Sequence, residues 1–248
     1  QNAEIKAIVE SRETPGFENT IVALDNSGRT LARVKGVFYA LTEADTNDEM
    51  SALSEKIAPV LSEHNDNIYL NQDLYKRVAA VWQQEQEGKI TLTTEQHRLL
   101  DRYYKAFIRS GAGLDAGKQN RLREINKELS TLAITFSNHV LNENNAYRLV
   151  IDNEAELAGL PEWVKTGAAE EAKAVGKEGK WLFTLQNSSR LPLLQYADNR
   201  ELRKDIYEAY INRGNNGDAN DNKEILKKII SLRLEKANLL GFDCYSNF

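Results

Sequence analysis

The feature that most constrains this sequence is a long run of apolar residues at helical spacing between about residues 115 and 144. Side chains three and four positions apart lie on one face of an α-helix, so a stripe kept over many turns predicts one long helix with one buried side. The stripe consists of Leu122, Ile125, Leu129, Leu132, Phe136 and Val140. A helix of this length favours a fold in which other helices pack against it.

Weaker helical patterns precede the long one. The first runs over residues 18–41, although Gly28 and Gly36 interrupt it. The motifs Thr46-Asn-Asp-Glu49 and Thr93-Thr-Glu-Gln96 have the form of capping boxes, which satisfy the free N–H groups at a helix start. A third helix is predicted from about residue 73, with Leu74, Val78, Val81 and Trp82 inward, and Gly111 is suited to stop the helix that starts after Thr93.

The spacing of apolar residues along the sequence changes after the long helix. Residues 147–152 and 180–186 are short, rich in β-branched and aromatic side chains, and bounded by Asn, Asp and Gly, which predicts a pair of strands. Residues 161–175 between them are rich in Ala and Glu and begin with Pro, which predicts a short helix. Helical spacing returns after Pro192, from about residue 198 and again from about residue 221, and Gly241 is suited to end the last helix.

Composition agrees with a helical reading. Charged residues make up 28% of the 248 residues, with 14 Gly and only 4 Pro, a balance that favours helices over turn-rich β architecture. We therefore predict an all-α fold, built mainly from long antiparallel helices, with one small two-stranded β element. Three segments are expected: a helical region over 1–145, a strand-helix-strand insert over 146–190, and a helical segment over 191–248.

Charge and cysteine content narrow the classes of partner. The formal net charge is -5 and the pI about 5.4, so no global positive field attracts phosphate backbones, and we expect no nucleic-acid partner. No apolar stretch is long enough for a membrane span, and the start, Gln1-Asn-Ala-Glu-Ile-Lys6, has no apolar core of a signal peptide, so we expect no membrane partner. The single cysteine, Cys244, suits a reducing compartment and is expected to be a small buried side chain. A cytoplasmic location is expected, and a periplasmic or exported parent stays open.

Residues with catalytic potential do not form a motif. Zinc proteases of the H-E-x-x-H type place two His one helical turn apart with a Glu between them, whereas His64, His97 and His139 lie in three different predicted helices. The pairs Glu85 with Glu87 and Glu170 with Glu171 are read as hydrated helix faces. We predict no catalytic and no metal-binding residue in this chain, and assign no substrate-binding residue. Aromatic side chains could line either a core or a peptide groove: Tyr103, Tyr104, Phe107, Trp181, Phe183, Tyr207 and Tyr210.

Several segments, in order along the chain, resemble one known family. They are Phe17-Glu-Asn-Thr-Ile-Val-Ala-Leu24, Ser27-Gly-Arg-Thr-Leu31, Thr46-Asn-Asp-Glu49, Ile68-Tyr-Leu-Asn71, Leu157-Ala-Gly-Leu160 and Leu239-Leu-Gly-Phe242. Together they are similar to the N-terminal portion of bacterial peptidyl-dipeptidases of the thimet-oligopeptidase family of zinc metallopeptidases. One departure is Asn187-Ser-Ser-Arg190, where relatives carry Asn-Pro or Asn-Thr, and no contact is assigned to that loop.

The resemblance implies a fold, and it implies that the zinc site lies in a part of the parent outside this chain. The fold would be the N-terminal part of a neurolysin-like helical ellipsoid, forming one wall of a deep substrate channel. The parent would bind zinc and release dipeptides from the C-terminus of oligopeptides, while the H-E-x-x-H helix would lie beyond Phe248 in a catalytic domain absent from this chain. The chain alone is therefore expected to be inactive and to bind no zinc, with oligopeptides and that catalytic domain as its partners.

Two other functions remain open at this point. A self-sufficient helical module that binds a peptide or protein, without enzymatic activity, explains the missing motif equally well. A helical nucleic-acid binder would need a basic face despite the overall acidity.

Overall fold

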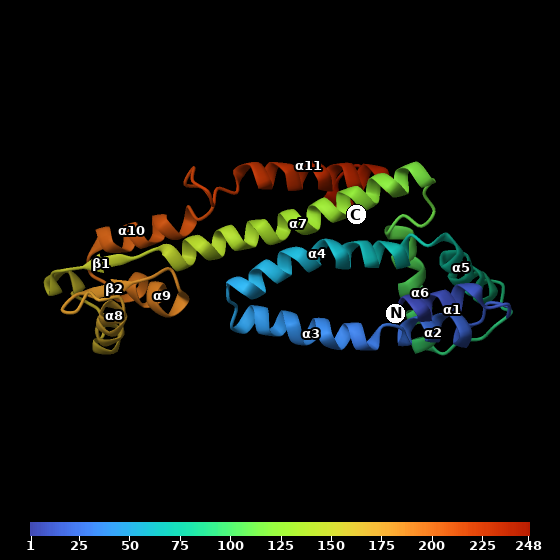
Figure 1. Ribbon diagram of the computed structural model, residues 1–248, viewed down its shortest axis with the longest axis horizontal. Coiled ribbons are helices and arrows are strands. Elements are labelled where there is room, and N and C mark those ends of the chain that lie inside the picture. The colour runs from blue at the N-terminus through green and yellow to red at the C-terminus, as the bar shows by residue number, and fades with distance from the viewer. The chain divides into compact units, whose positions relative to one another are not determined.

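The computed structural model describes all 248 residues and is mainly helical (Figure 1). One two-stranded sheet is present, so the predicted fold class, all-α with one small β element, is confirmed. None of the helices is both long enough and apolar enough to cross a membrane. The helices are α1 (Asn2–Glu10), the π-helix η1 (Phe17–Val22), α2 (Ala23–Asn26), α3 (Arg29–Ala44), α4 (Asp48–Tyr69), α5 (Gln72–Gln86), α6 (Thr94–Arg109), α7 (Ala116–Ala146), the 3-10 helix η2 (Glu154–Leu157), α8 (Glu162–Ala174), α9 (Asn187–Tyr196), α10 (Arg200–Ile211), α11 (Lys223–Leu239) and the 3-10 helix η3 (Tyr245–Asn247).

The chain packs into two compact units. Unit 1 comprises residues 1–134 and 229–248, and unit 2 comprises residues 135–228, so α7 and α11 each contribute to both. The three segments distinguished in the sequence, 1–145, 146–190 and 191–248, remain a prediction. Each unit has its own hydrophobic core.

The core of unit 1 is formed where α1, η1, α2, α5 and α6 meet. Its fully buried side chains include Ile21, Leu74, Val78, Leu100 and Phe107. These residues recur at helical spacing on their own elements, and burying each apolar side chain contributes about 1.5–3 kcal/mol. The inward face predicted for α5 is therefore confirmed at Leu74 and Val78.

A buried guanidinium fastens the segment after α1 to this core. Arg77 on α5 is 8% exposed, and its Nη1 donates to the carbonyl oxygens of Ser11 at 3.0 Å and Glu13 at 3.3 Å. These charge-assisted bonds satisfy carbonyl groups that have no helical partner. The α1 helix itself is an addition to what the sequence predicted.

The long helix predicted from the apolar stripe is confirmed as α7. Leu122 and Ile125 are fully buried in unit 1. Beside them, Arg121 donates to both carboxylate oxygens of Glu235 on α11, at 2.6 Å and 2.8 Å. This bidentate pair fixes the register between the two helices in unit 1.

Unit 2 is built around the small sheet. Strands β1 (Leu149–Ile151) and β2 (Trp181–Phe183) pair antiparallel, with Leu149 opposite Phe183 and Ile151 opposite Trp181. Helix α8 packs on β2, and α9 and α10 complete the core around the fully buried Leu193 and Ile206. The predicted strand-helix-strand order is confirmed.

Of the two predicted capping boxes, one is confirmed and one is wrong. At α6, the Thr93 N–H donates to Gln96 Oε1 at 3.0 Å and the Gln96 N–H donates to Thr93 Oγ1 at 3.3 Å, as predicted. At α4, however, the predicted cap Thr46 is wrong: Asn47 is the N-cap, and its side chain accepts from the Met50 N–H at 2.9 Å. The Asn side chain reaches the third N–H from an extended backbone, which displaces the start by one residue.

The segment around Asn187-Ser-Ser-Arg190 also differs. The loop predicted there is wrong, because these residues form the start of α9, which continues through Pro192. Upstream, the break within residues 18–41 falls at Gly28, whose φ of 71° is readily adopted only by Gly, whereas Gly36 lies inside α3.

A matched pair of glycines tests the packing of unit 2. Gly159 and Gly176 have φ of 84° and 74°, but only at Gly159 would a Cβ lie 2.4 Å from the backbone oxygen of Tyr196. We expect Gly176→Ala to cost about 1–2 kcal/mol from backbone strain alone, and Gly159→Ala to cost about 3 kcal/mol or more because backbone must shift as well. Urea unfolding followed by circular dichroism measures both. If the two variants lost equal free energy of unfolding, the Tyr196 backbone would not be packed against Gly159.

Candidate functional site

The three histidines lie on separate helices and each has its own partner. His64 on α4 contacts Gln1 Oε1 at 2.7 Å, and His97 on α6 contacts Glu85 Oε1 at 2.7 Å. His139 on α7 contacts Asn222 Oδ1 at 3.0 Å. No group of three or more His, Cys, Asp or Glu side chains is arranged to hold a metal ion.

The acidic pairs and the cysteine show no arrangement typical of a catalytic site. Hydrogen bonds from Lys89 and Gln83 lower the pKa of Glu87, the opposite of what a general acid requires. Glu170 and Glu171 are exposed on α8. Cys244 is half-buried, so the expectation of a buried side chain was wrong; its Sγ lies 3.0 Å from Ser246 Oγ, and that hydrogen bond lowers the pKa of the thiol.

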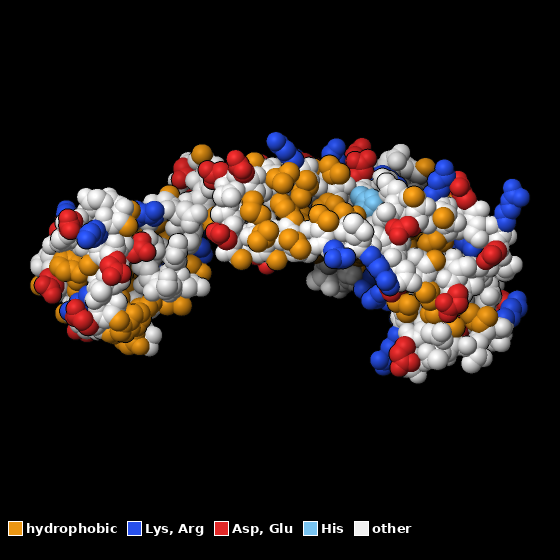
Figure 2. Space-filling view, turned by 60° about the horizontal axis from the view of Figure 1, so that its bottom comes forward, with side chains coloured by type: hydrophobic (Ala, Val, Ile, Leu, Met, Phe, Trp, Pro, Cys, Tyr) orange, Lys and Arg blue, Asp and Glu red, His pale blue; other side chains and the backbone are white.

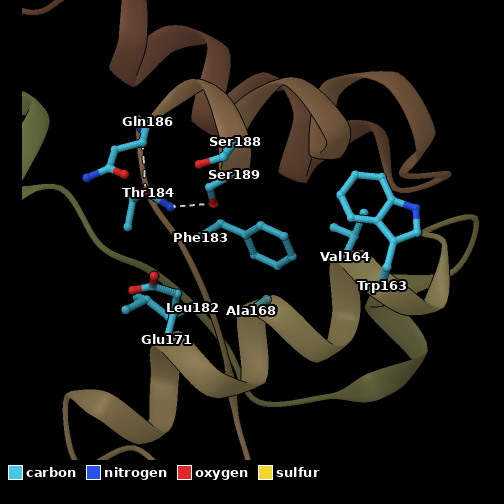
Figure 3. Close-up of a pocket in the computed structure, with 11 residues that line it drawn as sticks. Trp163, Val164, Ala168, Glu171, Leu182, Phe183, Thr184, Gln186, Ser188 and Ser189 are labelled. Atoms are coloured by element: carbon cyan, nitrogen blue, oxygen red, sulfur yellow. Dashed lines mark hydrogen bonds between the residues drawn. The ribbon is translucent and has the colours of Figure 1, made fainter. Parts of the chain in front are cut away.

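A small pocket opens in unit 2 between α8, the end of β2 and the start of α9 (Figure 3). Its volume is about 170 Å³. The Phe183 ring projects from β2 toward Val164 and Trp163 of α8, as Figure 3 shows. Phe183 and Val164 are buried, whereas Trp163 is 62% exposed at the rim. The pocket therefore has an apolar floor and an accessible indole at its edge.

Local hydrogen bonds shape the polar side of this pocket. The backbone N–H of Thr184 donates to Ser189 Oγ at 2.9 Å, and the Gln186 N–H approaches Thr184 Oγ1 at 3.4 Å. These bonds join the end of β2 to the first turn of α9 and place the Ser188 and Ser189 hydroxyls at the pocket wall. Such a volume suits one apolar side chain of an extended peptide, well below the size of a drug-like ligand site.

The aromatic residues considered from the sequence divide between core and surface. Phe107 and Phe183 belong to the two cores, whereas Tyr207 is 53% exposed. The Tyr210 ring lies between two guanidinium groups, Arg190 at 3.6 Å and Arg213 at 3.8 Å from its centroid. Trp163 was not among the predicted residues; its place in the first turn of α8 was the only available signal.

A second feature is an exposed apolar face on α3 in unit 1. None of its residues is buried, and Val34, Val37 and Leu41 are 61%, 62% and 53% exposed. Together with Phe38 and Arg33 they line an open groove of about 520 Å³. Apolar side chains gather in the middle of the space-filling view (Figure 2). A contiguous exposed patch of this kind is typical of an interaction surface.

Comparisons with known proteins identify relatives. Residues 193–248 match Peptidase family M3. The chain is 37% identical to the dipeptidyl carboxypeptidase of Escherichia coli over 99% of its own length and 36% of that protein. It is 32% identical to oligopeptidase A of Salmonella typhimurium, over 99% of this chain and 36% of the relative. Saccharolysin of Saccharomyces cerevisiae is 26% identical, over 95% and 32% of the two lengths.

The resemblance predicted from the sequence is confirmed by these relatives. Nearly the whole chain aligns, yet it spans only about a third of the length of the relatives it matches.

Two variants distinguish the rim of the unit 2 pocket from its floor. Trp163→Ala should change the free energy of unfolding by no more than about 0.5 kcal/mol, because the indole is mostly exposed. Phe183→Ala should cost about 3–5 kcal/mol, because it leaves a cavity in the core. Urea titration of both variants gives the comparison. A large loss from Trp163→Ala would make the indole a core residue and remove it as a contact for ligands.

Proposed function

We propose that this chain is the N-terminal, non-catalytic part of a zinc metallopeptidase that releases dipeptides from the C-terminus of oligopeptides. The single observation that carries the proposal is the alignment with a dipeptidyl carboxypeptidase at 37% identity over 99% of this chain and 36% of the relative. The specific reaction is inferred from that relative, a dipeptidyl carboxypeptidase.

The histidine geometry supports a catalytic centre located elsewhere in the parent. A zinc peptidase needs His and carboxylate ligands that converge on one point, with a Glu positioned to activate the metal-bound water. His64, His97 and His139 sit on three helices, each engaged by a different side chain. The residues present therefore do not fit a zinc site, and zinc and its ligands belong, on this proposal, to a segment that these 248 residues do not include.

Two surfaces fit a role inside a larger peptidase, one as an internal contact and one as part of the channel wall. The apolar face of α3, with Val34, Val37 and Leu41, would be covered by the rest of the peptidase, because a patch of this kind is costly to leave in water. The pocket with Trp163 and Phe183 would contact one side chain of an oligopeptide. Aromatic rims and small apolar floors are common in peptide-binding sites.

The alternative is a helical peptide- or protein-binding module without enzymatic activity. The accessible Trp163 beside an apolar floor is the observation that favours it. It differs from the main proposal in needing no further segment for its function.

Activity and metal content separate the two functions. The 248-residue chain is incubated with oligopeptides carrying either a free or an amidated C-terminus, and zinc is measured after dialysis. We expect no dipeptide release and no stoichiometric zinc, whereas a polypeptide continuing through an H-E-x-x-H helix should cleave the free-ended peptides and bind one zinc. Dipeptide release by the 248-residue chain alone would contradict the proposal.

The α3 face gives a second prediction. Val37→Asp should leave the free energy of unfolding of the 248-residue chain within about 0.5 kcal/mol, because Val37 is 62% exposed. In the longer peptidase the same change should lower the melting temperature, because it would place a carboxylate in an apolar contact. Ala40→Asp, also exposed on α3 but outside the groove, is the matched control. Equal effects of the two changes in the longer protein would argue that the α3 groove stays uncovered.

A further inference from the structure

A polar cavity of about 410 Å³ lies within unit 1, away from the pocket with Trp163. Residues of α4, α6, α7 and α11 line it, so it is built from segments far apart in the sequence. Its charged groups are Asp66, Arg109 and Lys236, and its apolar wall includes Tyr69 and Leu129. The volume lies in the range of small-molecule sites.

One amide organises the charges of this cavity. Asn126 Nδ2 donates to Asp66 Oδ1 at 2.8 Å, and Lys236 Nζ donates to Asn126 Oδ1 at 2.8 Å. The carboxylate and the ammonium therefore lie on the two sides of one side-chain amide and form no direct ion pair with each other. Both keep hydrogen-bonding capacity, since a carboxylate accepts several bonds and an ammonium carries three N–H donors.

Burial outweighs the nearby opposite charges at both groups, Arg123 and Lys236 at Asp66, and Asp66 at Lys236. Asp66 is only 5% exposed, and burial raises the pKa of its carboxyl group despite the hydrogen bond from Asn126. Burial likewise lowers the pKa of Lys236. Groups that are buried without a direct counter-ion carry a desolvation cost, which a ligand with matching charges would offset.

A second cationic side chain, Arg109, lines the same cavity. It lies exposed at the C-terminal end of α6. Its guanidinium group is able to bind a carboxylate through two parallel hydrogen bonds. The cavity thus contains two cationic side chains, Lys236 and Arg109, that could bind a ligand carboxylate, and one carboxylate, Asp66, that could bind a ligand ammonium group.

From this arrangement we propose that the cavity binds a small zwitterion, a free amino acid or a dipeptide. The ligand carboxylate is bound by Lys236 and Arg109, its ammonium by Asp66, and its side chain lies against Tyr69 and Leu129. The proposal does not rest on the peptidase function: it depends only on the charges and apolar wall of this cavity. A bare anion such as phosphate would meet the two cations but leave Asp66 uncompensated, so it is expected to bind more weakly.

A ligand series on the 248-residue chain tests the proposal. Isothermal titration calorimetry compares the dipeptide Ala-Leu with its N-acetyl form, its C-terminal amide, and inorganic phosphate. Blocking either end should weaken binding about tenfold, since each removes one charge-assisted contact. Equal affinity of the free and blocked forms, tighter binding of phosphate, or no detectable binding of Ala-Leu would overturn it.

Variants then assign the contacts. Lys236→Met should abolish the difference between Ala-Leu and its amide, and Asp66→Asn the difference between Ala-Leu and its N-acetyl form. Lys227→Met on the same helix, where the side chain is 72% exposed, should retain both differences. Circular dichroism checks that each variant folds, and if one does not, the ligand series on the unaltered chain decides alone. Unchanged discrimination in a folded Lys236→Met protein would contradict the assigned site.

Discussion

The burial of apolar side chains in two separate cores decides which helices of this chain are held in place and which faces are left open. In unit 1 the core gathers α1, η1, α2, α5 and α6 around Leu74 and Phe107. In unit 2 it gathers α8, α9 and α10 around the small sheet. Helix α3 contributes no buried side chain to either core, although it carries an apolar stripe. Its exposed side chains Val34, Val37 and Leu41 remain open on the surface of unit 1.

Local signals in the sequence were sufficient for most of the secondary structure. The stripe with Leu122 and Ile125 predicted α7, and the Thr93 capping box and both strands were also found, because each depends on residues close together in the chain. The start of α9 was missed because Asn, Ser and an internal Pro192 are weak helix formers, and tertiary packing of Leu193 stabilises the helix instead.

Exposure could not be predicted in the same way. Periodicity identifies an apolar face but does not say what covers it: Leu53 and Val60 recur at helical spacing on α4, yet they are 46% and 62% exposed. The cavity around Asn126 was also invisible, because Asp66 and Lys236 come from distant helices and form no motif. The pocket at Trp163 was missed for the same reason: three elements meet there only after folding.

The distribution of polar groups gives the functional conclusion its physical basis. Hydrolysis at zinc needs ligands that converge, and here the imidazoles of His64, His97 and His139 are each bound to a different neighbour. On our proposal, the chain therefore provides scaffold and contact surface, and the zinc chemistry belongs to other residues of a longer protein. The most direct test is to read the coding sequence that follows residue 248. We expect an in-frame H-E-x-x-H motif with a further Glu ligand downstream; a stop codon directly after Phe248 would contradict this conclusion.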